Sequence, residues 1–165
     1  MSQVIASLHS SVETCLIDTG IRFKIFTCDP ELADTAAFCA HYGFALGQSA
    51  NAIIVASKSE PIKFACCLVL ANCKLDVNKR LCQLLEVKKA SFATAEQTLE
   101  LTGMQIGGVT PFGLEKMPIY VDAAVLVNSE IVVGGGNRST KVLLHPEELK
   151  KLPNVEIIEG LAIPK

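Results

Sequence analysis

The sequence LTGMQIGGVTPFG, at residues 101–113, joins a helix end to a glycine-rich turn. Thr94, followed by Gln97 three residues later, forms a capping box for a helix that we expect to end at Gly103. In the turn at residues 107–113, glycines permit positive φ and a close approach of the backbone to a ligand, and a proline restricts the chain. Exposed N–H groups there can hold a carbonyl, carboxylate or phosphate oxygen. From composition alone, an ordinary tight connection is the simpler interpretation.

On both sides of this stretch, hydrophobic periodicity and turn residues predict short helices alternating with strands. The other predicted helices are residues 4–18, 35–42 (ended by Gly43), 76–85 (capped by Asp76) and a short one starting at Pro146. The predicted strands are residues 21–26, 52–56, 62–71, 119–122, 130–134 and 140–144, of which the second and third form a central hairpin. This order predicts an α+β fold with a mixed, mainly antiparallel, barrel-like β-sheet surrounded by short helices.

The length and composition predict one domain, residues 1–165. Half of the residues are hydrophobic and tryptophan is absent, so the core must be packed with Leu, Ile, Val, Ala and Cys. The longest apolar run, residues 64–71, is far shorter than the roughly 18–20 residues that span a bilayer. The N-terminus also lacks a signal-peptide pattern. We therefore expect a soluble, cytoplasmic protein with no membrane partner.

The seven cysteines contain no CxxC pair, and the three histidines lie far apart in the sequence. Because zinc sites use closely spaced ligand pairs, we expect no metal and no cofactor. Free cysteines of this kind usually serve as small core residues. The net charge of −2 argues against binding nucleic acid by bulk electrostatics but allows a local basic patch.

A second glycine cluster, residues 134–138, has neither the P-loop spacing nor the dinucleotide-binding GxGxxG pattern. It can be a bulge or turn at a strand end. Alternatively, Arg138 and the nearby Lys141 can hold a phosphate or a carboxylate. The chain contains no GxSxG sequence, and no Ser/His/Asp triad can be assembled from its residues.

The ordered set of motifs resembles the YbaK / prolyl-tRNA-synthetase-associated editing domain family. Gly107 and Pro111 occupy the positions of that family's G-x-x-x-P signature. Residues 71–79 are similar to the family's leucine-aspartate-leucine-x-lysine helix entry, and residues 135–138 and 143–149 to its C-terminal strand and helix. The resemblance covers approximately residues 23–152, which is most of the chain.

By this resemblance, the chain is expected to be a trans-acting aminoacyl-tRNA deacylase, an ester hydrolase acting on the 3′ end of a mischarged tRNA. The amino acid removed is expected to be small: Ala, Ser, Thr or Cys. A water activated near the backbone amides of the turn would attack the ester, so the expected catalytic residues are Gly107, Gly108, Val109, Thr110 and Pro111. The expected substrate-binding residues are Asn51, Asp122, Gly135, Gly136, Arg138 and Lys141. A synthetase that delivers the tRNA is a candidate partner, and no oligomeric state follows.

The chain departs from the family pattern at one central position. Members of the family carry a lysine near the start of the first central strand, where this sequence has Asn51. A neutral amide binds a phosphate or a ribose hydroxyl more weakly than an ammonium group does. Where some members carry an acid, three residues past Arg138, this chain has Lys141. We hypothesise that Lys141 supplies the cation that Asn51 lacks.

Two other functions remain as alternatives. The loss of the family lysine favours a non-catalytic module that binds an amino acid, a nucleotide or a synthetase. A hydrolase that acts on a free small ester is the second alternative.

Overall fold

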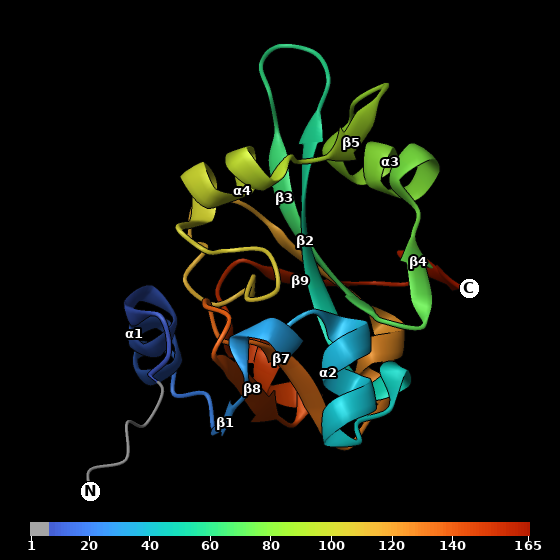
Figure 1. Ribbon diagram of the computed structural model, residues 1–165. Helices are drawn as coiled ribbons and strands as arrows, with labels where there is room; N and C mark the ends of the chain where they lie inside the picture. The colour runs from blue at the N-terminus through green and yellow to red at the C-terminus, as the bar shows by residue number, and fades with distance from the viewer. Residues whose placement is uncertain (1–6) are drawn as a thin grey trace, which may run out of the picture.

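The computed structural model describes residues 7–165, and its strands fall into three sheets (Figure 1). The largest has the order β5 (Ala90–Phe92), β2 (Ala50–Ser57), β3 (Phe64–Leu70), β6 (Ile119–Asp122), β9 (Val155–Ile158). The second has the order β1 (Lys24–Thr27), β8 (Thr140–Leu144), β7 (Ile131–Gly134), and the third pairs β10 (Ala162–Pro164) with β4 (Cys73–Leu75).

Short helices connect these strands. The α-helices are α1 (Ser10–Asp18), α2 (Thr35–Tyr42), α3 (Cys82–Leu85) and α4 (Ala95–Thr102), and the π-helix η3 (Val77–Leu81) leads into α3. The 3₁₀ helices are η1 (Pro30–Leu32), η2 (Leu46–Gln48), η4 (Ala123–Val127) and η5 (Pro146–Lys151). Among residues 7–165, no helix combines the length and apolar character needed to cross a membrane.

The predicted α+β class and mixed sheet are confirmed. The named strand pairs are antiparallel except that β6 runs parallel to both β3 and β9. The barrel-like closure that we predicted is not formed, because no strand pairing between described residues closes a sheet on itself. The helix η4 separates β6 from β7, and β7 then pairs with β8 in a sheet of its own, which touches the larger sheet at the bridge Ser49–Val132.

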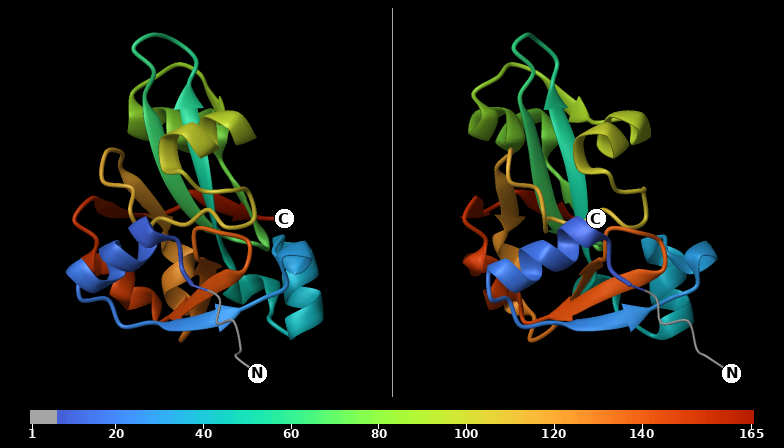
Figure 2. Two further views of the ribbon diagram at one scale, coloured as in Figure 1. Left: turned by 60° about the vertical axis from the view of Figure 1, so that its left-hand side comes forward. Right: turned by 90° about the vertical axis from the view of Figure 1, so that its left-hand side faces the viewer.

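The central hairpin β2–β3 is present as predicted. One face of it contributes Ile54 and Cys66 to the main hydrophobic core, and the opposite face contributes Val55 and Cys67 to a second core beneath α3. Burial on both faces explains why these strands read as continuous apolar runs instead of alternating ones. The tip of the hairpin projects at the end of the molecule opposite the three-stranded sheet (Figures 1 and 2).

The helix-capping predictions hold. The Gln97 amide donates to Oγ1 of Thr94 (3.0 Å), and the Thr94 amide donates to Oε1 of Gln97 (2.9 Å), which completes the capping box of α4. Gly103 ends that helix with φ of 71°. Asp76 accepts a hydrogen bond from the Lys79 amide at the start of η3.

Several elements differ from the prediction in their bounds or helix type, and three of them are informative. The first helix begins at Ser10, because His9 is its N-cap; residues 4–6 of the predicted helix lie outside the described residues. The strand predicted at residues 21–26 forms only as β1, since the Ile21 amide still donates to Leu16 at the helix end. The last predicted helix is the 3₁₀ helix η5.

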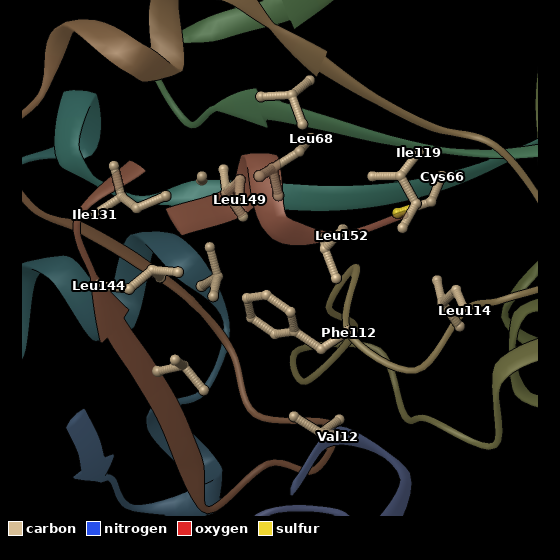
Figure 3. Packing of buried hydrophobic residues seen from close by; sticks show 14 of the residues in the cluster. Val12, Cys66, Leu68, Phe112, Leu114, Ile119, Ile131, Leu144, Leu149 and Leu152 are labelled. Atoms are coloured by element: carbon tan, nitrogen blue, oxygen red, sulfur yellow. The ribbon is translucent and has the colours of Figure 1, made fainter. Parts of the chain in front are cut away.

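Phe112 anchors the glycine-rich turn in the main core. Its ring is fully buried and points among Val12 of α1 and the leucines Leu144, Leu149 and Leu152 (Figure 3). The turn therefore connects a surface helix to the interior of the protein. Burial of an aromatic side chain at one end restricts where the preceding glycines can lie.

Candidate functional site

A cavity of about 280 Å³, called the site cavity below, opens where the glycine-rich turn approaches β2 and β7. It is lined by residues of α2, β2, β5, α4, the turn, β7 and β8: Asp34, Thr35, Ser49, Ala50, Asn51, Ala52, Ile53, Ile54, Phe92, Ala93, Thr98, Ile106, Gly107, Val109, Val132, Val133, Gly134 and Lys141. A larger hollow of about 570 Å³ beside α3 and the hairpin contains none of the predicted site residues in its lining.

The turn presents part of its backbone to the site cavity. Gly107 lines the cavity and has φ of 93°, a conformation that glycine adopts without strain. The Gly108 amide is already used, because it donates to the carbonyl of Gln105 (2.9 Å). The amides of Gly107 and Val109 donate to no protein acceptor among residues 7–165. The Thr110 amide is likewise unpaired among these residues, but Thr110 is fully buried and does not line the cavity. Of the predicted backbone donors, Gly107 and Val109 are therefore the ones that combine an unpaired amide with a place in the cavity lining.

The second glycine cluster packs directly against the turn. The Gly136 amide donates to the carbonyl of Gly108 (2.7 Å). A Cβ on Gly134 would collide with the carbonyls of Val109 and Gly108, and the latter would be 2.6 Å away. The backbones approach this closely only because Gly134 lacks a side chain. Gly134 itself lines the site cavity, so this cluster forms part of the cavity wall and supports the turn.

Lys141 holds the turn from inside the protein. Its side chain extends from β8, the residue is only 7% exposed, and its Nζ donates to the carbonyls of Gly107 and Ala33, each at 2.8 Å. The Nζ also lies 5.2 Å from the centroid of the Phe38 ring, where a cation–π interaction stabilises the charge. Burial lowers the pKa of the Lys141 ammonium group. It is the only lysine or arginine among the residues lining the site cavity.

Arg138 links three segments around the turn without lining the cavity. Its Nη1 donates to the carbonyl of Ile106 (2.8 Å) and to Oδ1 of Asp34 (3.1 Å), and its Nε donates to the carbonyl of Pro30 (3.1 Å). These contacts tie the start of α2 to the turn. Arg138 thus contacts the cavity wall from outside, and the structure does not bring its guanidinium into the cavity lining.

Asn51 lies on β2 in the wall of the site cavity, opposite the turn. Its Oδ1 accepts a hydrogen bond from Oγ1 of Thr35 at 2.6 Å. The Nδ2 group of Asn51 donates to no acceptor among residues 7–165, so it is available to a ligand in the cavity.

Several predicted residues lie elsewhere. Asp122 is 2% exposed at the end of β6, beside β10, and burial raises the pKa of its carboxyl group; the nearby amides of Leu161 and Ala162 partly offset this effect. Thr110 is fully buried. The predicted residues outside the cavity lining are Gly108, Thr110, Pro111, Asp122, Gly135, Gly136 and Arg138.

The most informative residues missed by the sequence analysis are Asp34 and Thr35, which line the cavity at the start of α2. In the sequence they read simply as a helix N-terminus. The missed apolar lining comes from strand positions, such as Ile54 and Val133, whose shared surface is created only by tertiary packing. Within residues 7–165, no group of three or more potential metal ligands is present.

Comparison with known proteins identifies the surrounding fold. A family model described as the aminoacyl-tRNA editing domain matches residues 29–152. The crystal structure of the hypothetical protein APE2540 is similar with a TM-score of 0.82, at 21% identity, covering 92% of this chain and 99% of that chain. A "putative trans-editing enzyme for prolyl tRNA synthetase" is similar with a TM-score of 0.78, at 23% identity, covering 94% of this chain and 96% of that chain.

One curated relative also matches over part of its length. The uncharacterized protein YwhH of Bacillus subtilis (strain 168) is 36% identical over 64 residues. The match spans 38% of this chain and 41% of that protein, so it covers less than half of either.

Proposed function

Because the chain belongs to the aminoacyl-tRNA editing domain family, we propose that it is an aminoacyl-tRNA deacylase that acts in trans. It would hydrolyse the ester between a small amino acid (Ala, Ser, Thr or Cys) and the 3′-terminal ribose of a mischarged tRNA. The main support for this proposal is the position of the site cavity. It lies within the matched residues and is lined by Gly107 and Val109, whose amides donate to no acceptor among residues 7–165.

The size and lining of the cavity support a small side chain. Its volume of about 280 Å³ is below the range of roughly 300–1,000 Å³ typical of drug-sized ligands. Ala52, Ile54 and Val133 contribute apolar surface, and the charged groups of Asp34 and Lys141 add polar surface. A small amino acid would place its side chain on the apolar part and its polar ester on the turn.

Hydrolysis in this cavity would depend on backbone donors and a water molecule. No histidine or cysteine is among the lining residues, so a His-activated nucleophile is not available there. The free amides of Gly107 and Val109 would stabilise the oxyanion formed when water attacks, and such a donor contributes about 2.7–4 kcal/mol. The terminal hydroxyl of the tRNA, as the family resemblance implies, would help to activate the water.

A non-catalytic binding module is the second candidate, and one specific observation favours it. Asn51 carries no charge, and its Oδ1 is occupied by Thr35. Lys141, the cation that we hypothesised to replace the family lysine, donates two of its three N–H groups to backbone carbonyls. In this case the cavity would bind an amino acid, a nucleotide or a synthetase segment without cleaving an ester.

A panel of mischarged tRNAs separates these functions. The purified chain is incubated with alanyl-, seryl-, threonyl- and cysteinyl-tRNA, and the loss of aminoacyl-tRNA is compared with the uncatalysed rate. Hydrolysis above that rate supports the deacylase. Saturable binding without hydrolysis leaves only the binding module, and turnover of small acyl esters that lack tRNA favours the free-ester hydrolase.

The variant Asn51→Lys tests the departure from the family pattern in the same panel. If the missing ammonium limits an existing deacylase, Asn51→Lys should raise kcat/KM for the preferred substrate. If the wild-type chain is inactive and Asn51→Lys gains activity, the binding-module interpretation of the natural protein is supported.

A further inference from the structure

Asp34 occupies a helix N-cap position but does not cap the helix. Aspartate at this position usually accepts a hydrogen bond from one of the first amides of the helix. In α2 the Asp34 side chain makes no such bond, and its carboxylate instead faces Arg138, with Nη1 to Oδ1 at 3.1 Å. Asp34 therefore does not cap the helix; it pairs with Arg138 and is among the residues that line the site cavity.

The carboxylate of Asp34 lies immediately beside Gly107. A Cβ built on Gly107 would collide with Nη1 of Arg138 and would be 3.0 Å from Oδ1 of Asp34, so both partners of this ion pair lie next to Gly107. In an aminoacyl ester, the ammonium nitrogen is bonded to the carbon adjacent to the carbonyl. A carbonyl bound at Gly107 therefore places the ammonium group within reach of Asp34.

The other charges at the cavity leave Asp34 available to a cationic ligand. It is the only carboxylate among the lining residues, and its side chain is 65% exposed. Arg138 occupies one side of this carboxylate, and an ionised carboxylate accepts about four hydrogen bonds. The ammonium of Lys141 is held by the carbonyls of Ala33 and Gly107.

We infer that Asp34 binds the α-ammonium group of the substrate, which makes the site selective for esters that carry a free, protonated amino group. This inference rests on the proposed function, because it takes the carbonyl of the ester to be bound at Gly107. It adds a specificity-determining residue and a substrate class: aminoacyl esters are accepted, whereas esters of the same size without the positive charge are disfavoured.

A matched pair of substrates tests this selectivity. Deamination of alanyl-tRNA with nitrous acid gives lactyl-tRNA, in which a hydroxyl replaces the ammonium group with almost no change in size. After correction for the uncatalysed rates, the wild-type protein should prefer alanyl-tRNA by about tenfold in kcat/KM, the effect of one partly exposed charge-assisted contact. Asp34→Asn, which preserves the shape of the side chain, should lower kcat/KM for alanyl-tRNA by about tenfold and leave lactyl-tRNA unchanged.

A structural role of Asp34 would give a different pattern. If the carboxylate serves only to hold Arg138, Asp34→Asn lowers kcat/KM for both substrates equally, and this result would overturn the inference. A wild-type enzyme without a preference would overturn it as well. Asp29→Asn is the matched control, because Asp29 caps η1 and does not line the cavity. That variant should keep the wild-type preference.

Binding keeps the inference testable if no substrate is hydrolysed. In that case the proposed deacylase fails, and the probes become 3′-alanylamino-adenosine and 3′-lactylamino-adenosine, whose amide bonds resist hydrolysis. Calorimetric titration should show about tenfold tighter binding of the alanyl compound to the wild-type protein and no preference in Asp34→Asn. Equal binding of the two compounds to the wild-type protein would show that Asp34 does not recognise the ammonium group.

Discussion

Lys141 Nζ lies 2.8 Å from the carbonyl oxygen of Gly107, so a buried ammonium group on β8 holds the glycine-rich turn in place. The same Nζ reaches the carbonyl of Ala33, immediately before Asp34. One side chain therefore connects the two segments that carry the free amides and the carboxylate of the site cavity. In the sequence, Lys141 appeared as a substitute for a missing tRNA-binding cation; the structure shows it bonded to the protein's own backbone.

Replacing Lys141 with methionine should reduce both stability and deacylation. The apolar side chain fits the buried space but leaves the carbonyls of Gly107 and Ala33 without a donor, which should cost about 2 kcal/mol in the free energy of unfolding. With the turn less restrained, kcat should fall by at least about tenfold, as small misplacements of a site do. Urea denaturation and single-turnover assays measure the two effects. Lys24→Met, at an exposed position on β1, is the control; unchanged kcat in Lys141→Met would contradict a role in the site.

Alanine at Gly107 should damage the site more than alanine at a comparable glycine. Gly107 and Gly20 both have positive φ, so alanine strains the backbone by about 1–2 kcal/mol at either position. At Gly20 nothing lies within 4 Å of the added Cβ, whereas at Gly107 it would collide with Arg138. Deacylation should therefore be lost in Gly107→Ala and retained in Gly20→Ala. A fully active Gly107→Ala protein would show that the turn is not the catalytic site.

The variant Asn51→Asp tests the Nδ2 donor of the Asn51 amide separately from its Oδ1 acceptor. The new carboxylate still accepts the hydrogen bond from Thr35, but the Nδ2 donor, which no protein acceptor among residues 7–165 uses, is gone. We expect kcat to fall by about tenfold, the cost of one hydrogen bond to a substrate group, while the melting temperature stays near that of the wild type. Assays at saturating tRNA distinguish this fall in kcat from weaker substrate binding caused by the added negative charge. An unchanged kcat would mean that Nδ2 takes no part in the reaction.

The Glu148 carboxylate should make the free energy of unfolding depend on pH. Its carboxylate accepts hydrogen bonds from Lys151 Nζ and the Arg22 amide, each at 2.7 Å, and these lower the pKa of Glu148. Because the folded state binds the proton more weakly, the stabilisation is complete above the unfolded value of about 4.3 and is lost as pH falls through the lowered pKa.

The variant Glu148→Gln measures this contribution. It should unfold about 1–2 kcal/mol more easily than the wild type at pH 7, and the difference should shrink in acid. Glu147→Gln removes a neighbouring carboxylate whose pair with Lys150 is half exposed, so it should change stability by less than about 1 kcal/mol. A difference for Glu148→Gln that does not decrease in acid would argue against the ionised carboxylate as its cause.

Local signals in the sequence were sufficient for much of the fold. The capping box at Thr94 and the left-handed glycine at Gly103 mark a helix through contacts a few residues apart, and the structure contains that helix. The two apolar runs at residues 52–56 and 62–71 predicted the central hairpin because strands buried on both faces are apolar throughout. Such features depend on neighbours in the chain, so the sequence alone determines them.

The short strands β4, β5, β9 and β10 could not be predicted in this way. Each is three or four residues long and is defined by a partner distant in the chain, such as β6 for β9 and β4 for β10. The open arrangement of three sheets is likewise a property of these pairings. The equally short β6 and β7 are buried throughout and could be recognised from their apolar residues, whereas these four strands are only partly buried and too short to show a periodicity of their own.

For the candidate site, too, some features follow from the sequence and others only from the tertiary structure. The sequence by itself determined that the glycine-rich turn exists, where it lies in the chain, and which family its motifs resemble. Only the tertiary structure decided which residues face one another: Lys141 binds Gly107 across 34 positions, and Asp34 meets Arg138 across 104. The physical reason is that hydrogen bonds and ion pairs act over a few ångströms in space. Residues far apart in the chain therefore meet only once the sheets have packed.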